Sequence, residues 1–345
     1  MMGSDKSMSA IQSLDDVREI LKNLPKSDHA AAEKARQREP QLTKPGGSLG
    51  RLEEIAEWLA AWQGRHPPSI ERVKIVVFAG NHGVTAQGVS AFPAEVTHQM
   101  VANFEAGGAA INQLSKIQGA ELEVVALDLD APTRDFSGEP AMDDAECAAA
   151  FGRGMDAVGP DLDVVCVGEM GIGNTTAAAA ICHAIHGGEA ADWVGPGTGV
   201  EGDALAAKVR VVAGAVERHQ AAFGDGLDIL RHVGGRELAA LAGAITQARL
   251  GRISVVLDGY VTGAAAAALN ATEASALDHC IAGHVSAEPG HIRLLEKLDM
   301  PPLLNLGMRL GEASGAAVAV GILKCAAACH AGMATFGEAG VSDKD

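Results

Sequence analysis

The hydrophobic pattern divides the chain into two kinds of segment. Up to about residue 65, apolar positions recur every three to four residues, as at Leu52, Ile55 and Leu59, which is the spacing of an amphipathic helix. Ser13 precedes the first such stretch and is a typical helix N-cap. From about residue 72, short apolar runs rich in β-branched residues appear. They predict buried strands at 74–79, 122–127, 163–167, 252–257 and 303–306.

Helical patterns occupy the intervals between these strands. We expect helices over 94–114, 175–186, 203–223, 237–250, 262–271, 289–298 and, in an Ala-rich stretch, 313–332. Strands that alternate with helices form parallel sheets. The sequence therefore predicts an α/β fold with a doubly wound, mostly parallel, Rossmann-like sheet. We expect 66–309 to form a large α/β domain, and 1–65 plus 310–345 to form a small helical domain from the two chain ends.

Composition and charge narrow the class of protein. Apolar residues make up 48% of the 345 residues, enough for a large core. A formal net charge of −17 argues against a nucleic-acid partner but allows a small anionic substrate. The six cysteines form no CxxC pair, and we interpret them as core residues of a cytoplasmic protein. Without an apolar signal segment or a long unbroken apolar run, no export and no membrane association are expected.

Glycines and polar residues follow four of the predicted strands, at 80–88, 168–176, 258–262 and 307–315. Ligands of open α/β sheets bind beyond the carboxyl ends of the strands, so these loops predict one site at that rim. The segments 171–176 and 195–199 each precede a predicted helix whose free N–H groups suit an anion. An ordinary Asn or Thr N-cap after a glycine turn gives the same pattern. Lys208, taken alone, has the pattern of a solvated surface charge.

Known nucleotide and metal motifs are missing from these loops. There is no GxxxxGK[ST] segment, and the stretch from Gly171 lacks the third glycine of the dinucleotide-binding fingerprint, so ATP hydrolysis and hydride transfer have no motif support. His82 and the other histidines show no zinc-type spacing. We therefore expect no metal and no cofactor.

Two carboxylates stand in the Gly-rich loops, Glu169 and Glu312. Apolar surroundings raise the pKa of a carboxyl group, which suits proton transfer near neutrality, whereas pairing of Glu312 with Arg309 would oppose that shift. A helix cap or a surface ion pair is the alternative for either glutamate. Two carboxylates also fit glycoside hydrolysis, but the scarcity of Trp and Tyr leaves few platforms for a sugar.

Six motifs occur in a fixed order along the chain: Lys44-Pro-Gly-Gly-Ser-Leu-Gly-Arg-Leu-Glu53, Gly80-Asn-His-Gly-Val84, Gly168-Glu-Met-Gly-Ile-Gly-Asn-Thr-Thr176, Gly195-Pro-Gly-Thr-Gly199, Leu257-Asp258-Gly259 and Arg309-Leu-Gly-Glu-Ala-Ser-Gly-Ala316. Together they resemble the nicotinate-nucleotide:dimethylbenzimidazole phosphoribosyltransferases from about residue 40 to 340. The resemblance implies transfer of phosphoribosyl from nicotinate mononucleotide to 5,6-dimethylbenzimidazole, which gives α-ribazole 5′-phosphate and nicotinate in cobalamin biosynthesis. It also implies a homodimer.

The resemblance further implies roles for individual residues. Glu312 matches the general base, and Glu169 and Lys208 match two further catalytic positions. The candidate substrate contacts are Gly171, Gly173, Asn174, Thr175, Gly197, Gly199, Ser286, Arg309 and His82. The family often has Gly-Thr after the glutamate where this chain has Ala313-Ser314, but Ser keeps the hydroxyl group. The sequence does not identify the residues that flank the aromatic base, nor the preferred acceptor.

Two functions from other classes stay open at this point. One is a hydrolase that cleaves nucleotides to base and ribose phosphate with water as the acceptor. The other is a non-catalytic nucleotide-binding protein, which would leave nicotinate mononucleotide intact.

Overall fold

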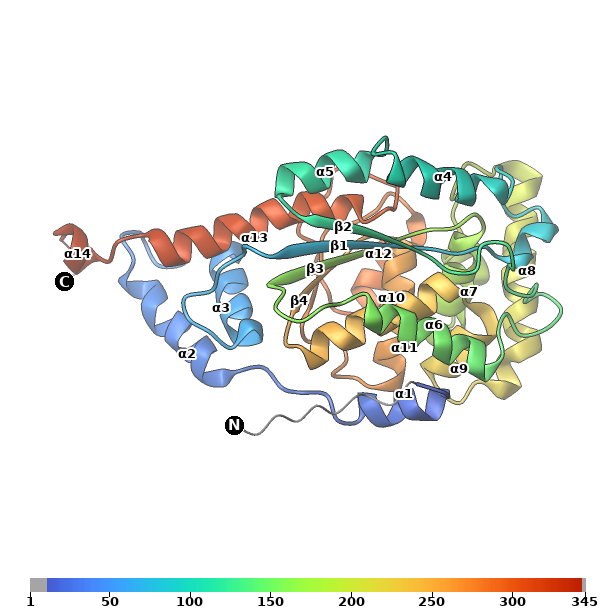
Figure 1. The fold of residues 1–345 in the computed structure, drawn as a ribbon, viewed down its shortest axis with the longest axis horizontal. Helices are drawn as coiled ribbons and strands as arrows, with labels where there is room; N and C mark the ends of the chain where they lie inside the picture. The colour runs from blue at the N-terminus through green and yellow to red at the C-terminus, as the bar shows by residue number, and fades with distance from the viewer. Residues whose placement is uncertain (1–10, 343–345) are drawn as a thin grey trace.

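A computed structural model describes residues 11–342 of the chain. Its centre is a five-stranded sheet in the order β2-β1-β3-β4-β5, and all neighbouring strands are parallel (Figure 1). The strands are β1 (Val73–Ala79), β2 (Glu121–Ala126), β3 (Val164–Met170), β4 (Ser254–Leu257) and β5 (Cys280–Ala282). Helices flank the sheet, so the predicted α/β fold with a parallel sheet is confirmed.

The helices occupy most of the remaining described chain. Short 3-10 turns apart, they are α1 (Leu14–Leu21), α2 (His29–Arg38), α3 (Arg51–Gln63), α4 (Glu95–Glu105), α5 (Ala110–Gln118), α6 (Asp144–Asp156), α7 (Asn174–His186), α8 (Gly202–His219), α9 (Gly226–Val233), α10 (Arg236–Leu250), α11 (Tyr260–Thr272), α12 (Pro289–Lys297), α13 (Ser314–Gly332) and α14 (Phe336–Ala339). Ser13 caps α1 as expected, because its side chain accepts the backbone N–H of Asp16.

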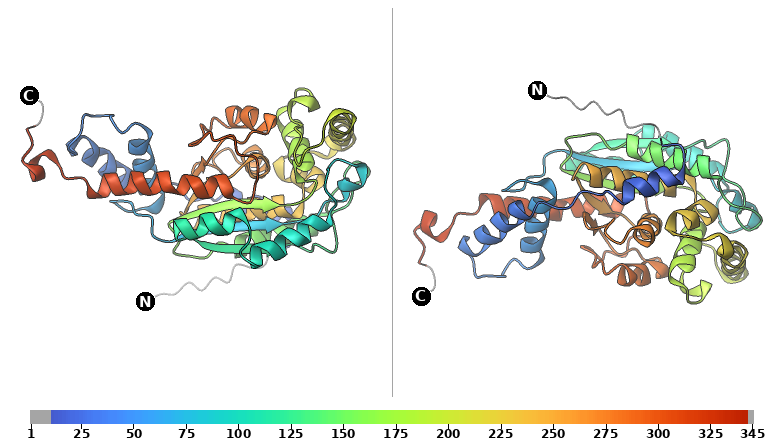
Figure 2. Two further views of the ribbon diagram at one scale, coloured as in Figure 1. Left: turned by 90° about the horizontal axis from the view of Figure 1, so that it is seen from above. Right: turned by 90° about the horizontal axis from the view of Figure 1, so that it is seen from below.

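Alternate residues of the central strands feed two separate cores. On β1, Val76 and Phe78 belong to one core together with residues of α6, α7, α10 and α11, whereas Ile75 and Val77 belong to another with residues of α3, α5 and α13. Successive side chains of a strand point to opposite faces, so a strand covered on both faces must be apolar throughout. Figures 1 and 2 show α4, α5 and α13 over one face of the sheet and α6 and α10 over the other. These two layers hold the strand ends, and the loops that follow them, in fixed positions.

Glycine allows α6 and α10 to pack closely. A Cβ atom at Gly154 of α6 would lie 1.8 Å from the carbonyl oxygen of Ala240. One at Gly243 of α10 would lie 1.9 Å from the carbonyl oxygen of Phe151. Because both distances are far below van der Waals contact, any side chain at these positions would separate the two helices.

Several predicted elements differ from the structure. The helix expected over 94–114 is two helices, α4 and α5, which part at Gly107, where φ is +79°. The segment 303–306 forms only an isolated bridge with His284, since the preceding Pro301-Pro302 offers no N–H groups for a ladder. The fifth strand is instead β5, which is too short to stand out in the sequence. Helices α6 and α9 lie where no helix was predicted.

The two chain ends meet beside the sheet. Helices α2 and α3 and the outer part of α13 project from one end of the molecule, at the left of Figure 1, and both views of Figure 2 agree. Leu42 forms an isolated bridge with Thr335, and Glu39 pairs with His330 of α13. Helix α1 lies apart from them, against α6. Arg18 of α1 also pairs with Asp225, the residue before α9. The division into two domains at the expected boundaries stays a prediction.

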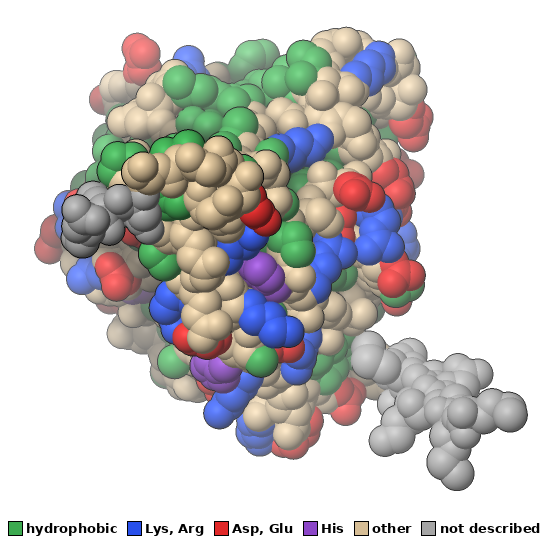
Figure 3. All heavy atoms as spheres, turned by 90° about the vertical axis from the view of Figure 1, so that its left-hand side faces the viewer, with side chains coloured by type: hydrophobic (Ala, Val, Ile, Leu, Met, Phe, Trp, Pro, Cys, Tyr) green, Lys and Arg blue, Asp and Glu red, His purple; other side chains and the backbone are tan. Residues whose placement is uncertain are grey.

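Figure 3 looks at this projecting end and shows several Lys and Arg side chains close together on it, with His side chains among them. The net charge of the whole chain is −17. Carboxylates balance several of the cations at this end, because Lys44 pairs with Glu39 and Glu53, and Arg36 pairs with Glu33 and Glu57.

Helix α13 is long and apolar enough to span a membrane by length and composition, with a mean hydropathy of 1.4 over 18 residues. The expectation that every Ala-rich run breaks too early is therefore wrong for this helix. Half of that window is buried inside the protein. Ala316, Val320 and Leu323 belong to the same core as Ile75 of β1 and Leu59 of α3. Its apolar side thus has protein partners, as in a core helix.

Candidate active site

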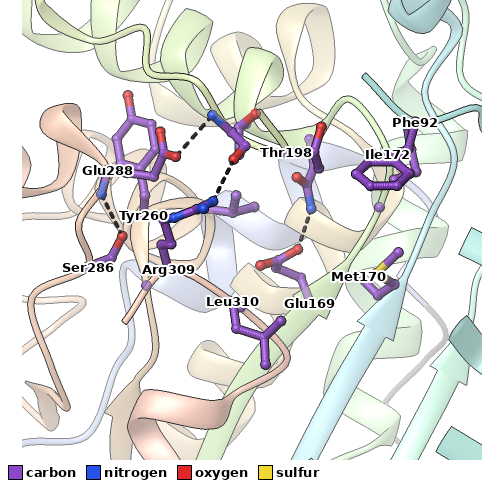
Figure 4. Close-up of a pocket in the computed structure, with 17 residues that line it drawn as sticks. Phe92, Glu169, Met170, Ile172, Thr198, Tyr260, Ser286, Glu288, Arg309 and Leu310 are labelled. Atoms are coloured by element: carbon purple, nitrogen blue, oxygen red, sulfur yellow. Dashed lines mark hydrogen bonds between the residues drawn. The ribbon is translucent and has the colours of Figure 1, made fainter. Parts of the chain in front are cut away.

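The loops beyond the carboxyl ends of β3, β4 and β5 enclose a pocket of about 290 Å³ (Figure 4). Residues 169–175 span the end of β3 and the turn after it, 259–261 follow β4, and 286–288 follow β5, while 309–311 lead into α13. Three of the four predicted loops therefore line one pocket. The fourth, 80–88, does not reach it, although Phe92 a few residues further on does.

The candidate residues divide into those that line this pocket and those that lie behind it. The lining includes Glu169, Gly171, Asn174, Thr175, Gly197, Ser286 and Arg309. Gly173, Gly199, Lys208, Glu312 and His82 are not part of the lining.

The Gly-rich turn after β3 leads directly into α7. Gly173 is the residue before the helix and has a φ of +96°, a conformation that side chains rarely adopt. Among the described residues no side chain caps α7, so the alternative of an ordinary Asn or Thr N-cap does not apply here. The side chain of Asn174 donates instead to Oε2 of Glu169. The N–H groups of Asn174 and Thr176 donate to the carbonyl oxygens of Gly171 and Gly173, which leaves the N–H of Thr175 suited to an anion.

Lys208 is buried, with 1% of its surface exposed, so its interpretation as a solvated charge is wrong. Its ammonium group donates to Oγ1 of Thr175 at 2.8 Å and to the carbonyl oxygen of Gly195 at 3.0 Å. Burial lowers the pKa of Lys208 to about 8, while Glu288 nearby raises it. The lysine thus lies directly behind two of the glycine loops and holds them together.

Glu288 is a pocket residue that the sequence did not reveal. Its Oε1 accepts the backbone N–H of Gly197 at 3.0 Å, and its own N–H donates to Oγ of Ser286 at 3.0 Å. Burial raises the pKa of Glu288, and Lys208 opposes that shift. Glu288 belongs to none of the sequence motifs, and only folding brings it to the 195–199 loop.

Arg309 does not pair with Glu312. Its Nη1 lies 3.5 Å from the carbonyl oxygen of Gly197, across the pocket mouth. Arg309 therefore does not lower the pKa of Glu312, and burial, which raises it, decides the expected competition.

Glu312 has a backbone φ of +62°, and the next residue, Ala313, has a φ of +60°. Two successive non-glycine residues in the left-handed region mark a strained turn, of the kind found at functional sites. The N–H of Glu312 donates to the carbonyl oxygen of Glu169 at 3.1 Å, which joins this turn to the end of β3. At Gly168, a Cβ atom would lie 2.1 Å from the nitrogen of Ala313, so the turn fits only against glycine.

Both glutamates have raised pKa values. Burial, followed by the charge of Asp258, raises the pKa of Glu312 to about 7. Burial, Asp258 and then Glu237 raise that of Glu169 to about 8, although the hydrogen bond from Asn174 lowers it. Oε2 of Glu312 is buried and has no hydrogen-bond partner within the described chain. A carboxyl group with a pKa near 7 exchanges protons readily at neutral pH.

His82 lies beneath the pocket rather than in it. It is fully buried and pairs with Glu237 of α10. A Cβ atom at Gly171 would lie 3.3 Å from Oε1 of Glu237, so this pair supports the turn after β3 from below. The structure therefore does not place His82 where it could contact a substrate in this pocket.

An apolar wall completes the pocket, and no pattern in the sequence pointed to it. Phe92, Met170 and Ile172 lie on the side of Glu169 that faces away from Ser286 and Glu288, and Leu310 lies below Glu169 (Figure 4). They come from three separate segments. A hydrogen bond of 3.0 Å between Ser90 and Thr198 ties the segment that carries Phe92 to the 195–199 loop.

No group of three or more His, Cys, Asp or Glu within residues 11–342 is arranged to hold a metal ion. The expectation that the chemistry needs no metal stays a prediction.

A parallel α/β sheet with two protonatable carboxylates among glycine-rich loops is typical of an enzyme that uses acid–base chemistry on a phosphorylated substrate. The family model described as a phosphoribosyltransferase (DBI_PRT) matches residues 24–341, and the chain belongs to this family.

Relatives that share one enzyme name match almost the whole chain. The nicotinate-nucleotide–dimethylbenzimidazole phosphoribosyltransferase of Rhizobium meliloti (strain 1021) is 58% identical over 331 residues, which are 96% of this chain and 98% of that protein. The one of Methylocella silvestris is 57% identical over 331 residues, with 96% and 97% covered. The crystal structure of CobT from Thermus thermophilus is similar with a TM-score of 0.85 and 40% identity, over 91% of this chain and 100% of that one.

Proposed function

We propose that this enzyme transfers the phosphoribosyl group of nicotinate mononucleotide to 5,6-dimethylbenzimidazole, giving α-ribazole 5′-phosphate and nicotinate in cobalamin biosynthesis. The relatives described above carry this activity in their names, at 57–58% identity over nearly the full chain. The observation that carries the proposal within the structure is the pair of glutamates with raised pKa values. Glu169 lines the pocket between the glycine loops and the apolar wall, and Glu312 lies next to it, joined to it by a backbone hydrogen bond.

The proposal assigns the two halves of the pocket to the two substrates. Phosphate and ribose lie against the glycine loops, where backbone N–H groups, Ser286 and Arg309 are available and Lys208 lies behind. The flat acceptor base lies against Phe92, Met170 and Leu310, because an aromatic ring gains from burial against apolar side chains. An apolar wall of this kind favours an aromatic acceptor over water.

The reaction then needs one base. A nitrogen of the benzimidazole attacks the anomeric carbon, that C–N bond forms, and the bond to nicotinate breaks with its electron pair leaving on the pyridine nitrogen. Attack opposite to nicotinate converts a β-nucleotide into an α-product. The other ring nitrogen becomes acidic and gives its proton to Glu312, whose pKa of about 7 leaves a large ionised fraction at neutral pH.

One incubation tests this function against the two alternatives. The enzyme is mixed with nicotinate mononucleotide, with and without 5,6-dimethylbenzimidazole, and the products are separated by chromatography. We expect nicotinate and α-ribazole 5′-phosphate only when the acceptor is present. Release of nicotinate and ribose phosphate without the acceptor would identify a hydrolase, and an unchanged nucleotide in both samples would identify a binding protein.

The proposal also includes a homodimer. Phe92 and Leu310 are 50% and 55% exposed beside the pocket, and large apolar side chains at a surface favour association. Light scattering after gel filtration should give twice the chain mass, and a mass near 35.2 kDa would contradict it.

The cytoplasm is the proposed compartment, with no nucleic acid as partner. The cysteines within the described chain are free thiols, as a reducing compartment maintains. The net charge of −17 repels phosphate backbones. Recovery of the enzyme in the membrane fraction of lysed cells would contradict this placement.

A further inference from the structure

A second cavity, of about 330 Å³, lies on the other side of the molecule from the candidate active site. It is bounded by the linker between α1 and α2, which runs below the sheet in Figure 1, and by residues next to the amino ends of β4 and β5. The pocket described above lies at the carboxyl ends of the same strands, so the two cavities are separate.

Arg249, at the end of α10, lies at the wall of this cavity with 2% of its surface exposed. The guanidinium carbon lies 4.1 Å above the ring centre of Trp62, which covers one face of the group. Its only carboxylate contact within residues 11–342 is Asp278, at 3.4 Å from Nη2, and the Asp278 side chain is 56% exposed. Nε and Nη1 are buried and have no hydrogen-bond partner in the described chain.

The positive charge of Arg249 is only partly compensated by its neighbours. A buried charge is costly unless it is paired and hydrogen-bonded, and two of the three guanidinium nitrogens of Arg249 lack a partner within residues 11–342. Burial lowers the pKa of Arg249, and Asp278 only partly offsets that shift. Arg249 therefore lines a cavity large enough for a small ligand, while two of its nitrogens, both buried in this structure, have no partner within residues 11–342.

The linker adds further positive charge opposite Arg249. Lys22 and Lys26 both line the cavity. Lys22 pairs with Glu19 at 2.6 Å, whereas Lys26 has no carboxylate partner among the described residues. The carboxylate of Glu273 also lines the cavity, but its Oε1 already accepts the N–H and the hydroxyl group of the serine two residues further on. Arg249, with one carboxylate 3.4 Å away, and Lys26, with none among the described residues, are thus the lining cations whose charge is least compensated.

We propose that this cavity is a second ligand site, which binds a tetrahedral oxyanion, either free phosphate or the phosphate of a monoester, between Arg249 and Lys26. An arginine with free N–H groups and an exposed lysine are the usual phosphate partners in proteins. An anion held there would connect the linker to the end of α10 and so fasten α1 and α2 to the body of the protein. The proposal does not depend on the reaction assigned to the active site.

Trp62 provides a direct readout, because the guanidinium that would hold the anion is stacked on it. Inorganic phosphate is titrated into the full-length protein while tryptophan fluorescence is recorded, and ribose 5-phosphate is titrated in a parallel sample. We expect a saturable change with at least one of the two, and the one that saturates at the lower concentration identifies the source of the anion. A Trp62→Phe variant should lose the change, which assigns the signal to this site rather than to the active site.

Substitutions of the linker give the decisive comparison. Lys26→Gln alters an exposed side chain and should fold normally, yet weaken phosphate binding roughly tenfold, as expected for loss of one charge-assisted hydrogen bond. Lys34→Gln, on the exposed face of α2, is the matched control and should bind as the wild type does. Equal affinities in these two variants, or no saturable change with either ligand, would overturn the proposal. Arg249→Gln should abolish binding if it folds.

Discussion

Replacing Glu312 by Gln tests the proposed general base most directly. The substitution keeps the size of the side chain and removes only its ability to take up a proton. A positioned base contributes about 10²–10⁴-fold to a rate, or about 3–5 kcal/mol of the activation barrier. We therefore expect kcat to fall by that factor. Because Oε2 of Glu312 has no hydrogen-bond partner in the described chain, the melting temperature should stay close to that of the wild type.

The pH profile gives the same test a second readout. The pKa of Glu312 is raised to about 7, so the carboxylate is ionised to about one tenth at pH 6 and about nine tenths at pH 8. A base works in its ionised form, so wild-type activity should rise about ninefold over this interval. The rise through pH 7 should be lost in Glu312→Gln. The assay is the initial rate of α-ribazole 5′-phosphate formation, measured from about pH 5.5 to about pH 8.5.

Glu169→Gln is the matched control. Glu169 stands beside Glu312 with a pKa of about 8, so it is largely protonated at neutral pH and is the poorer candidate base. Wild-type turnover in Glu312→Gln, or an unchanged rise through pH 7, would refute the role given to Glu312. If Glu169→Gln alone removed the pH-dependent rise, the base would be Glu169.

Three substitutions test other parts of the site and the fold. Lys208→Met should raise KM for nicotinate mononucleotide several-fold in steady-state kinetics, because the ammonium behind the glycine loops is lost; an unchanged KM would remove the lysine from nucleotide binding. Asp258→Asn should shift the rise in activity to lower pH, because the charge of Asp258 raises the pKa of Glu312; a shift to higher pH would contradict this. Gly154→Ala should destabilise the protein by about 3 kcal/mol in urea unfolding, since its Cβ atom would meet α10, whereas Gly152→Ala, with open space around it, should stabilise by up to about 1 kcal/mol.

The sequence alone determined the architecture of the sheet. Four of the five strands were predicted, because a strand covered on both faces must be apolar throughout, and this leaves a continuous β-branched run. β5 was missed because a three-residue strand carries too little pattern. The split between α4 and α5 depends on the backbone conformation at Gly107, which a hydrophobic period does not encode.

The sequence also located the loops of the site, because parallel strands bring their carboxyl ends to one edge. It could not assign the surroundings of each side chain. Lys208 resembles a surface charge in the sequence and is buried, since the loops that cover it come from elsewhere in the chain. His82 resembles a loop histidine and is buried against Glu237, which lies 155 residues further along the chain.

The pKa values of the two glutamates were decided only by the tertiary structure. They depend on burial and on Asp258, which reaches them through folding and not through sequence proximity. The apolar wall has the same origin, because Phe92, Met170 and Leu310 come from separate segments. Local pattern specifies which elements form and where loops begin, whereas electrostatic environment and pocket shape arise from contacts between residues far apart in the chain.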